Sequence, residues 1–407
     1  MASSPDFRHL LPRAGHSRAW WRAPASRSGL AWAIAQAASA LDAPLLLIAA
    51  DNQQAHQLES DLRTLIRDPA ALPLLPFPDW ETLPYDSFSP HPDIVSQRLA
   101  TLHGLPTLKR GIVIVPVQTL LQRLAPLSHV VGGSFDYRVG ARLDLDAEKR
   151  RLESAGYRNV PQVLDPGDFA VRGGLLDVHP MGTDTPYRIE LFDDEIDSIR
   201  AFDAESQRSG DRVEAVRLLP GREVPMDEAA RERAMTALRD DFGIDTRRSA
   251  LYQDLKNGLA PAGIEAWLPL FFEARRDAAS TSTLFDYLPE GTLPLLADGV
   301  GEAADKFWMQ TGERYEQRRH DAERPLLPPE ALYLTPVALR ERLNTGTRIE
   351  VVDDAHPRHE EAHVLGVQPV PNLPLSEHHA EPASALKAFL RSYEGDVVIA
   401  AESAGRR

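Results

Sequence analysis

Two short apolar runs constrain the fold of this chain more than any other feature of its sequence. They read PLLLIAA at Pro44–Ala50 and GIVIVPV at Gly111–Val117, with no polar side chain in either run. A strand that is apolar on both sides belongs in a parallel sheet whose two faces are covered by helices. Helical patterns surround the first run, because Ser28 can cap LAWAIAQAASAL and Asp51 or Asn52 can cap QQAHQLESDLRTLI. The first third therefore predicts an α/β domain with a parallel sheet.

The pattern changes after about residue 135. A helical stretch near Leu145–Ser154 is followed by short strands, with turns at Gly173-Gly174 and Asp193-Asp194. The predicted strands are Asp168–Arg172, Leu175–His179, Tyr187–Phe192, Ile196–Phe202 and Arg212–Leu219. Closely spaced strands with short turns between them are typical of an antiparallel sheet. We therefore expect a small α+β (antiparallel) domain inserted into the α/β domain.

These changes of pattern divide the chain into five parts. We expect the first part of the α/β domain at 1–134, the inserted α+β domain at 135–220, and the second part of the α/β domain at 221–352. Residues 353–382 are rich in His, Glu and Pro and lack a period, which predicts a linker. Residues 383–407 offer one helix and one strand, which predicts the start of an incomplete small α/β domain. We therefore expect the chain to be the front end of a longer protein.

Composition excludes several kinds of chemistry. The 407 residues contain no cysteine, so disulfides, thiolate metal sites and cysteine nucleophiles are all excluded, and a reducing cytoplasm is the expected location. The formal charge of −15 opposes general binding to nucleic acid, although a local basic patch can overcome this repulsion. The longest apolar stretch, about Pro44–Ala50, is far below the roughly 18 residues of a membrane span. The N-terminal sequence also lacks the pattern of a signal peptide. We expect no membrane partner.

One short motif resembles a zinc site. His359, Glu360 and His363 match H-E-x-x-H, which on a helix places two imidazoles on one face beside a glutamate that acts as a general base. However, the segment lies between Pro357 and Pro369, which leaves little length for a rigid helix. Five-residue patterns also match often by coincidence. We therefore interpret the match as coincidental and expect no metal.

A nucleotide site is the next alternative, because α/β domains often bind phosphates. A P-loop needs a glycine-rich turn followed by Lys and Ser or Thr at fixed spacing. The first junction before a helix reads Ala23-Pro24-Ala25-Ser26-Arg27-Ser28-Gly29, without a Gly-Lys-Thr sequence, and no lysine precedes Lys109. The P-loop is therefore absent at Ala23–Gly29, and we expect neither a bound cofactor nor ATP hydrolysis there.

The inserted domain contains a candidate binding surface. Arg172 ends a strand before two glycines, while Arg188 and Phe192 lie four residues apart on a later strand and so share a face. Arginine and aromatic residues contribute much of the energy of protein interfaces. In the alternative interpretation, Phe192 fills the core and the arginines pair with Asp177, Asp193 or Glu195. The residues alone leave both interpretations open and favour the alternative.

Three stretches resemble a known family. Asp79–Leu124 begins DWETLPYDSFSPHPDIVSQRL, Phe169–Arg200 reads FAVRGGLLDVHPMGTDTPYRIELFDDEIDSIR, and Asp321–Pro329 reads DAERPLLPP. Together they closely resemble the N-terminal region of the bacterial transcription-repair coupling factors (Mfd), which is built like the front of the repair protein UvrB. The resemblance extends from about Leu10 to Arg407. It implies a degenerate helicase-like α/β domain, without nucleotide motifs, that is split by an inserted domain which docks UvrA.

The resemblance also implies a function. The family's UvrA-contacting positions fall on Arg172, Arg188 and Phe192, which reverses the preference above and favours an interface. We then expect a non-catalytic adaptor that recruits UvrA, whereas RNA polymerase, DNA, ATP and Mg belong to later domains of the full-length family protein. Two alternatives remain, an ATP-dependent DNA translocase and a UvrB-like module that binds damaged DNA directly.

Overall fold

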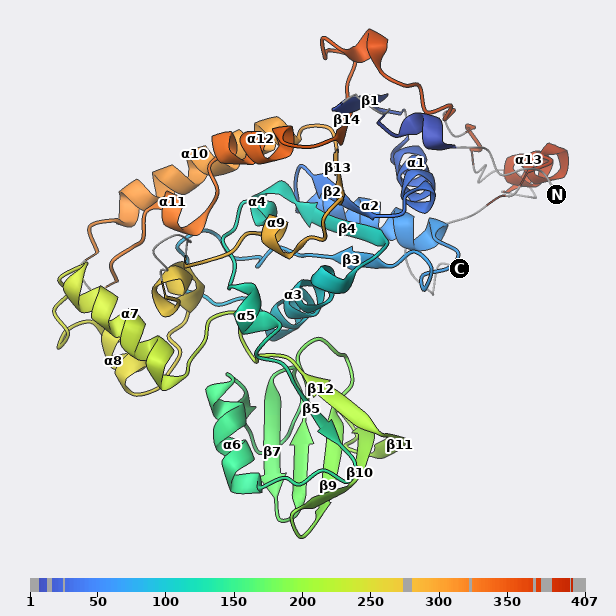
Figure 1. Cartoon of the computed structure of the whole chain (residues 1–407). Coiled ribbons are helices and arrows are strands. Elements are labelled where there is room, and N and C mark those ends of the chain that lie inside the picture. Colours follow the sequence, from blue (N-terminus) through green and yellow to red (C-terminus); the bar gives the residue numbers. More distant parts are fainter. Residues whose placement is uncertain are drawn as a thin grey trace.

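Two separate sheets organise the molecule, as Figure 1 shows. The computed structural model describes residues 7–12, 17–24, 26–273, 280–321, 324–368, 371–374, 383–395 and 397. Within these residues, the chain forms a six-stranded parallel sheet and, from a segment in its middle, a second six-stranded sheet that is mostly antiparallel. The predicted fold class, a parallel α/β domain interrupted by an α+β domain, is therefore confirmed. The strand predicted near the C-terminus lies outside the described residues.

The parallel sheet has the strand order β1-β14-β13-β2-β4-β3. Its strands are β1 (Arg18–Arg22), β2 (Pro44–Ala49), β3 (Leu74–Pro76), β4 (Gly111–Pro116), β13 (Leu293–Leu296) and β14 (Arg348–Val352). The two apolar runs form β2 and β4, which pair with Pro44 opposite Gly111, and every residue of both strands is buried. The sequence did not predict β1, which pairs in parallel with β14 at the edge of the sheet.

Helices cover both faces of this sheet. On one face, α1 (Arg27–Ala40) and α2 (Asn52–Leu65) pack against Leu45 and Leu47. On the other face, Leu46 and Ile48 join α3 (Pro92–Gly104), α4 (Val117–Leu120) and α10 (Val300–Arg318) in a second core. This alternation is the two-residue period of a strand that is buried on both sides.

The helix caps settle two details of the sequence prediction. Asp51 caps α2, as predicted, by accepting a hydrogen bond from the backbone N–H of Gln54 at 2.7 Å. Helix α1 begins earlier than predicted, because Ser26 rather than Ser28 is its N-cap and accepts from the N–H of Gly29 at 3.3 Å. Both residues are serines two positions apart, so the sequence pattern could not distinguish them.

The inserted segment has the strand order β11-β10-β9-β8-β7-β6. Its strands are β6 (Arg158–Asn159), β7 (Asp168–Arg172), β8 (Leu175–Val178), β9 (Tyr187–Phe192), β10 (Glu195–Phe202) and β11 (Ser209–Val213). Helix α6 (Leu145–Ser154) packs beside β6 and β7, and its Leu152 joins the core that contains Leu176 and Ile189. One face of this sheet is therefore covered by its own helix.

One predicted strand of this segment was wrong in its extent. The stretch predicted as Arg212–Leu219 is divided between β11 and β12 (Ala215–Leu218), which belong to different sheets. Strand β12 pairs with β5 (Phe135–Arg138), at the other end of the segment, and the two form a small sheet of their own. The chain crosses between sheets at Glu214, and a continuous strand-forming sequence gives no sign of this change.

Mostly helical structure follows the inserted segment. Helix α5 (Leu127–Val130) precedes the inserted segment. The helices that follow it are α7 (Glu228–Asp240), α8 (Ala250–Lys256), α9 (Leu284–Tyr287), α11 (Pro329–Leu332), α12 (Pro336–Asn344) and α13 (Ser384–Ser392), besides α10. An unpredicted 3₁₀ helix at Ile264–Phe271 buries Trp267 and Leu268 in the larger core. Throughout the part of the chain that the structure describes, no helix has the length and apolar character needed to cross a membrane.

A buried ion pair links α3 of the parallel-sheet domain to the chain just after the inserted segment. Arg98 on α3 donates two hydrogen bonds to Glu223, which follows β12, at 2.6 and 3.2 Å, and the two side chains are 0% and 2% exposed. The guanidinium also lies over the rings of Phe77 and Trp80, and the indole N–H of Trp80 donates to Glu223 at 3.1 Å. Each polar group therefore has partners, which is the condition for burying charge.

Candidate protein interface on the antiparallel sheet

Two tight turns lie at one end of the antiparallel sheet. Gly173 and Gly174 join β7 to β8, and Gly173 has the left-handed φ of 58° that glycine adopts without strain. Asp193 and Asp194 join β9 to β10, and Asp193 has a φ of 54°, which aspartate tolerates better than most residues. Because Leu175 pairs with Glu190 across β8 and β9, both turns lie at the same end.

The strand register brings the three predicted residues to one face. Arg172 lies opposite Leu175, which lies opposite Glu190, and two residues further along Asp177 lies opposite Arg188. Side chains in neighbouring strands point the same way at paired positions and at every second residue. Arg172, Arg188 and Phe192 therefore share the face opposite the one that contributes Leu176 and Ile189 to the core. The grouping that the i, i+4 spacing predicted for Arg188 and Phe192 is present.

Phe192 is an exposed aromatic side chain. It is 76% exposed at the end of β9, beside the turn at Asp193. Leu175, near the other turn, is 36% exposed. Phe192 therefore does not fill the core, so this part of the alternative interpretation is wrong. Large exposed apolar side chains around a turn are suited to insertion into a partner.

Arg188 is held within the domain by Asp177. Its Nε and one terminal nitrogen donate to the two carboxylate oxygens at 2.7 and 2.8 Å, and its other terminal nitrogen donates to Ser209 Oγ at 3.3 Å. The guanidinium lies 5.0 Å from the centre of the Phe202 ring. Hydrogen bonding to Asp177 raises the pKa of Arg188 further above its ordinary range. The alternative interpretation expected this pairing, so the positive charge of Arg188 is largely compensated in the free protein.

Arg172 is exposed and has a different environment. Its guanidinium donates a hydrogen bond to the backbone carbonyl of Pro161, which belongs to the segment between β6 and β7. A carbonyl oxygen does not neutralise the charge, so Arg172 presents a positive group at the same end of the sheet as Phe192. Its position suits an acidic group on a partner.

Sequence reasoning missed further members of this face. Arg200 pairs with Arg188 across β9 and β10, and Arg212 pairs with Arg200 across β10 and β11, so three arginines form a row beside Asp177. Leu175 adds an apolar side chain near Phe192. Counting every second residue along one strand could not find these neighbours, because they depend on the register between strands.

The region where a P-loop would be expected has a different arrangement. Helix α1 follows β1, and its first turn is capped by the side chain of Ser26. A Cβ added at Gly29 would lie 2.3 Å from Cγ1 of Val367, so this distant side chain covers the start of the helix. Ala25 lies outside the described residues. The expectation that no nucleotide binds here stays a prediction.

The H-E-x-x-H segment does not have the geometry that its motif requires. His359 and Glu360 lie in a 3₁₀ helix, His359–Glu361, whereas His363 forms an isolated parallel bridge with Trp21. One ring nitrogen of His359 is 2.9 Å from the carbonyl oxygen of Asp353. The two histidines therefore do not share a turn of α-helix. Within the described residues, no group of three or more His, Asp or Glu side chains is placed to hold a metal.

Comparisons with known proteins agree with this architecture. Residues 135–223 match the family model described as the UvrB interaction domain. The chain is 41% identical to the transcription-repair-coupling factor of Escherichia coli K12 over 403 residues, which covers 99% of this chain and 34% of that protein. It is 41% identical over 333 residues to the factor of Haemophilus influenzae, and 35% identical over 326 residues to that of Myxococcus xanthus. These matches cover 81% and 77% of this chain, and 28% and 27% of the relatives.

The resemblance drawn from the sequence is therefore confirmed. The chain is similar over nearly its whole length to the N-terminal region of the transcription-repair coupling factors, and it contains a segment that matches the model of the UvrB interaction domain. It spans about a third of the length of the curated relatives that it matches.

Proposed function

We propose that this chain acts as an adaptor that recruits UvrA to lesions where RNA polymerase has stalled, in transcription-coupled nucleotide excision repair in the cytoplasm. Phe192 carries the proposal, because it is an exposed aromatic side chain on the same face as Arg172 and Arg188 and within the segment that matches the UvrB interaction domain. Phe192 would be the apolar anchor, and Arg172 would pair with an acidic group on UvrA.

The proposal assigns no catalysis to this chain. RNA polymerase, DNA, ATP and Mg would be engaged by the portions of the full-length relatives that lie beyond the third matched here. The side chain of Val367 covers the start of α1, so the turn at Gly29 is not open to a phosphate. This supports an adaptor rather than a motor.

The structure determines which variants test the proposal. Reversing Arg188 to glutamate would place two carboxylates together, because Asp177 is only 4% exposed and faces it. Such a variant would lose stability, and its loss of binding would have two explanations. Arg172→Glu and Phe192→Ala avoid this difficulty because both side chains are exposed.

The test is calorimetric titration of UvrA with the 407-residue chain and with the Arg172→Glu/Phe192→Ala double variant. We expect the variant to fold and to bind UvrA at least a hundredfold more weakly. Arg150→Glu, at an exposed position of α6 on the other side of the sheet, is the matched control and should bind normally. Undiminished binding by the double variant would refute the proposal.

A further inference from the structure

A small pocket lies where the inserted segment meets the parallel-sheet domain. One wall comes from the end of the loop before α3 and the start of that helix, and the other from the segments beside β6, β7 and β12. The pocket measures about 230 Å³, which is below the usual size of pockets for drug-sized molecules. Pro90, Pro166 and Met181 in its walls are buried, so the pocket is recessed and has room only for a small ligand.

Arg222 contributes a cation without a counter-ion to this pocket. Its Nε donates a long hydrogen bond of 3.4 Å to the carbonyl of Gly156, and among the described residues neither terminal nitrogen has a hydrogen-bond or ion-pair partner. Burial lowers the pKa of the half-buried Arg222 guanidinium below its ordinary value. A charge that is partly removed from water without a partner is unfavourable, so the free N–H donors of Arg222 suit an anionic ligand.

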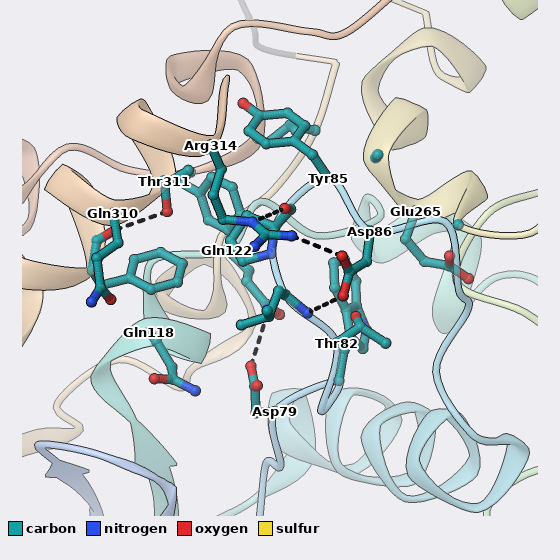
Figure 2. A pocket seen from close by; sticks show the side chains of 18 of the residues that line it. Asp79, Thr82, Tyr85, Asp86, Gln118, Gln122, Glu265, Gln310, Thr311 and Arg314 are labelled. Atoms are coloured by element: carbon teal, nitrogen blue, oxygen red, sulfur yellow. Dashed lines mark hydrogen bonds and ion pairs between the residues drawn. The ribbon is translucent and has the colours of Figure 1, made fainter. Parts of the chain in front are cut away.

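Glu265 also lines this pocket but is not the missing counter-ion. Its carboxylate accepts a hydrogen bond from Ser89 Oγ at 3.0 Å, and Figure 2 shows it apart from the ion pair of Arg314 and Asp86. Burial raises the pKa of Glu265 to about 7. A close ion pair with Arg222 would hold this pKa low instead, so the two side chains do not neutralise each other.

The remaining charges of the pocket are already paired. Arg158 lies 2.8 Å from Asp168, and Glu223 is bonded to Arg98. Arg222 therefore leaves a single positive charge to be balanced, and the two carboxylates that line the pocket would repel a ligand with more than one negative charge. This balance of charge suits a monoanion.

We propose that this pocket binds a small free monocarboxylate, whose two oxygens accept hydrogen bonds from the terminal nitrogens of Arg222. The planar fork of a guanidinium matches the two oxygens of a carboxylate. Pro92, Val95 and Met181 supply an apolar wall to the same pocket, which suits a ligand with a short hydrocarbon chain.

The pocket favours this ligand over two others of related chemistry. Phosphate also matches the fork of a guanidinium, but it has no apolar part and takes a second negative charge more readily. A carboxylate side chain of a protein partner would bring its backbone to a recess with little room for it. The pocket includes Gly167, at the opposite end of β7 from Arg172, so this inference does not depend on UvrA binding.

The test follows the Tm of the full chain as sodium propionate replaces sodium chloride at constant ionic strength, at a pH above the pKa of Glu265. A ligand that binds only the folded state raises the Tm, and the rise gives its apparent Kd. We expect Arg222→Met to raise this Kd at least about tenfold, and Arg222→Lys, which keeps the charge but loses the fork, to raise it as well. Glu265→Gln removes a negative charge from the pocket and should tighten binding. Arg150→Met, an exposed change on α6 outside the pocket, is the matched control and should respond as the unchanged chain does.

Three outcomes would overturn the proposal. An equal rise in Tm with folded Arg222→Met and Arg222→Lys, or no rise in the unchanged chain, would show that the guanidinium holds no carboxylate. Phosphate that stabilises the chain as strongly as propionate would show that the apolar wall is not used. Equal stabilisation by glutamate capped at both its amino and carboxyl groups, whose side chain ends in the same carboxylate, would refute a free molecule as the ligand.

Discussion

Replacing Phe192 with alanine tests the interface most directly, and the structure sets the size of the effect. A phenylalanine buries about 150–250 Å² in a complete contact. Because Phe192 is 76% exposed, at least about 110 Å² remains to be buried by a partner, worth about 3 kcal/mol at 25 cal/mol per Å². The entropic cost of ordering the turn on binding offsets part of this burial free energy. We therefore expect the substitution to weaken UvrA binding by about 2–3 kcal/mol, or 30- to 150-fold in Kd.

The same exposure predicts that folding is unaffected. A side chain that makes few contacts in the free protein leaves no cavity when it is truncated, so the free energy of unfolding should change by less than about 0.5 kcal/mol. Binding is measured by calorimetric titration with UvrA, and stability by urea denaturation of the same preparations. A fall in binding without a fall in stability identifies a contact residue.

Phe88→Ala supplies a matched control. Phe88 is 74% exposed, almost the same as Phe192, but it lies on the parallel-sheet domain. If general hydrophobicity drove the association, both variants would weaken it equally. Equal losses, or no loss with Phe192→Ala, would contradict the assignment of the inserted sheet as the UvrA surface.

Three further predictions concern buried charge and are measured by urea denaturation. Arg98→Met leaves Glu223 buried without its cation and should lower the free energy of unfolding by about 3–5 kcal/mol, most of which Glu223→Met should restore in the double variant. Burial raises the pKa of Glu265 to about 7 from 4.5, so the folded state holds a proton that the unfolded state has released. Stability should therefore fall as pH rises from 4.5 to 7, by about 3 kcal/mol at most, and Glu265→Gln should remove this slope. Arg188→Met leaves Asp177 unpaired and should cost about 2–4 kcal/mol, and a smaller loss would show that the pair is solvated.

The parts of the fold that local sequence determines were predictable. An apolar run of six or seven residues is too short for most helices and is typical of a doubly covered strand, which is why β2 and β4 were found. Strand β1 has arginine at both ends and was missed, since it becomes a strand only by pairing with β14, some 330 residues later. Its Trp21 is fully buried and donates from its indole N–H to the carbonyl of Leu10. Pairing between distant segments leaves no local pattern.

The same distinction applies to the sites. The spacing of Arg188 and Phe192 along one strand was enough to group them, because a strand has a fixed period. Their distance from Arg172, and the row that continues to Arg200, depend on the register of β7–β10.

The pairing of Arg188 with Asp177 changes how the interface should respond to salt. Arg188 is already bonded to a buried carboxylate, so its side chain is ordered before binding and little conformational entropy is lost when it contacts a partner. Because Asp177 compensates its charge, however, Arg188 brings little net charge to that contact. Arg172 donates to a carbonyl and keeps its charge. Of the two arginines assigned to UvrA, Arg172 should therefore contribute more to the salt dependence of the complex than Arg188, and most of the loss on mutation should follow Phe192.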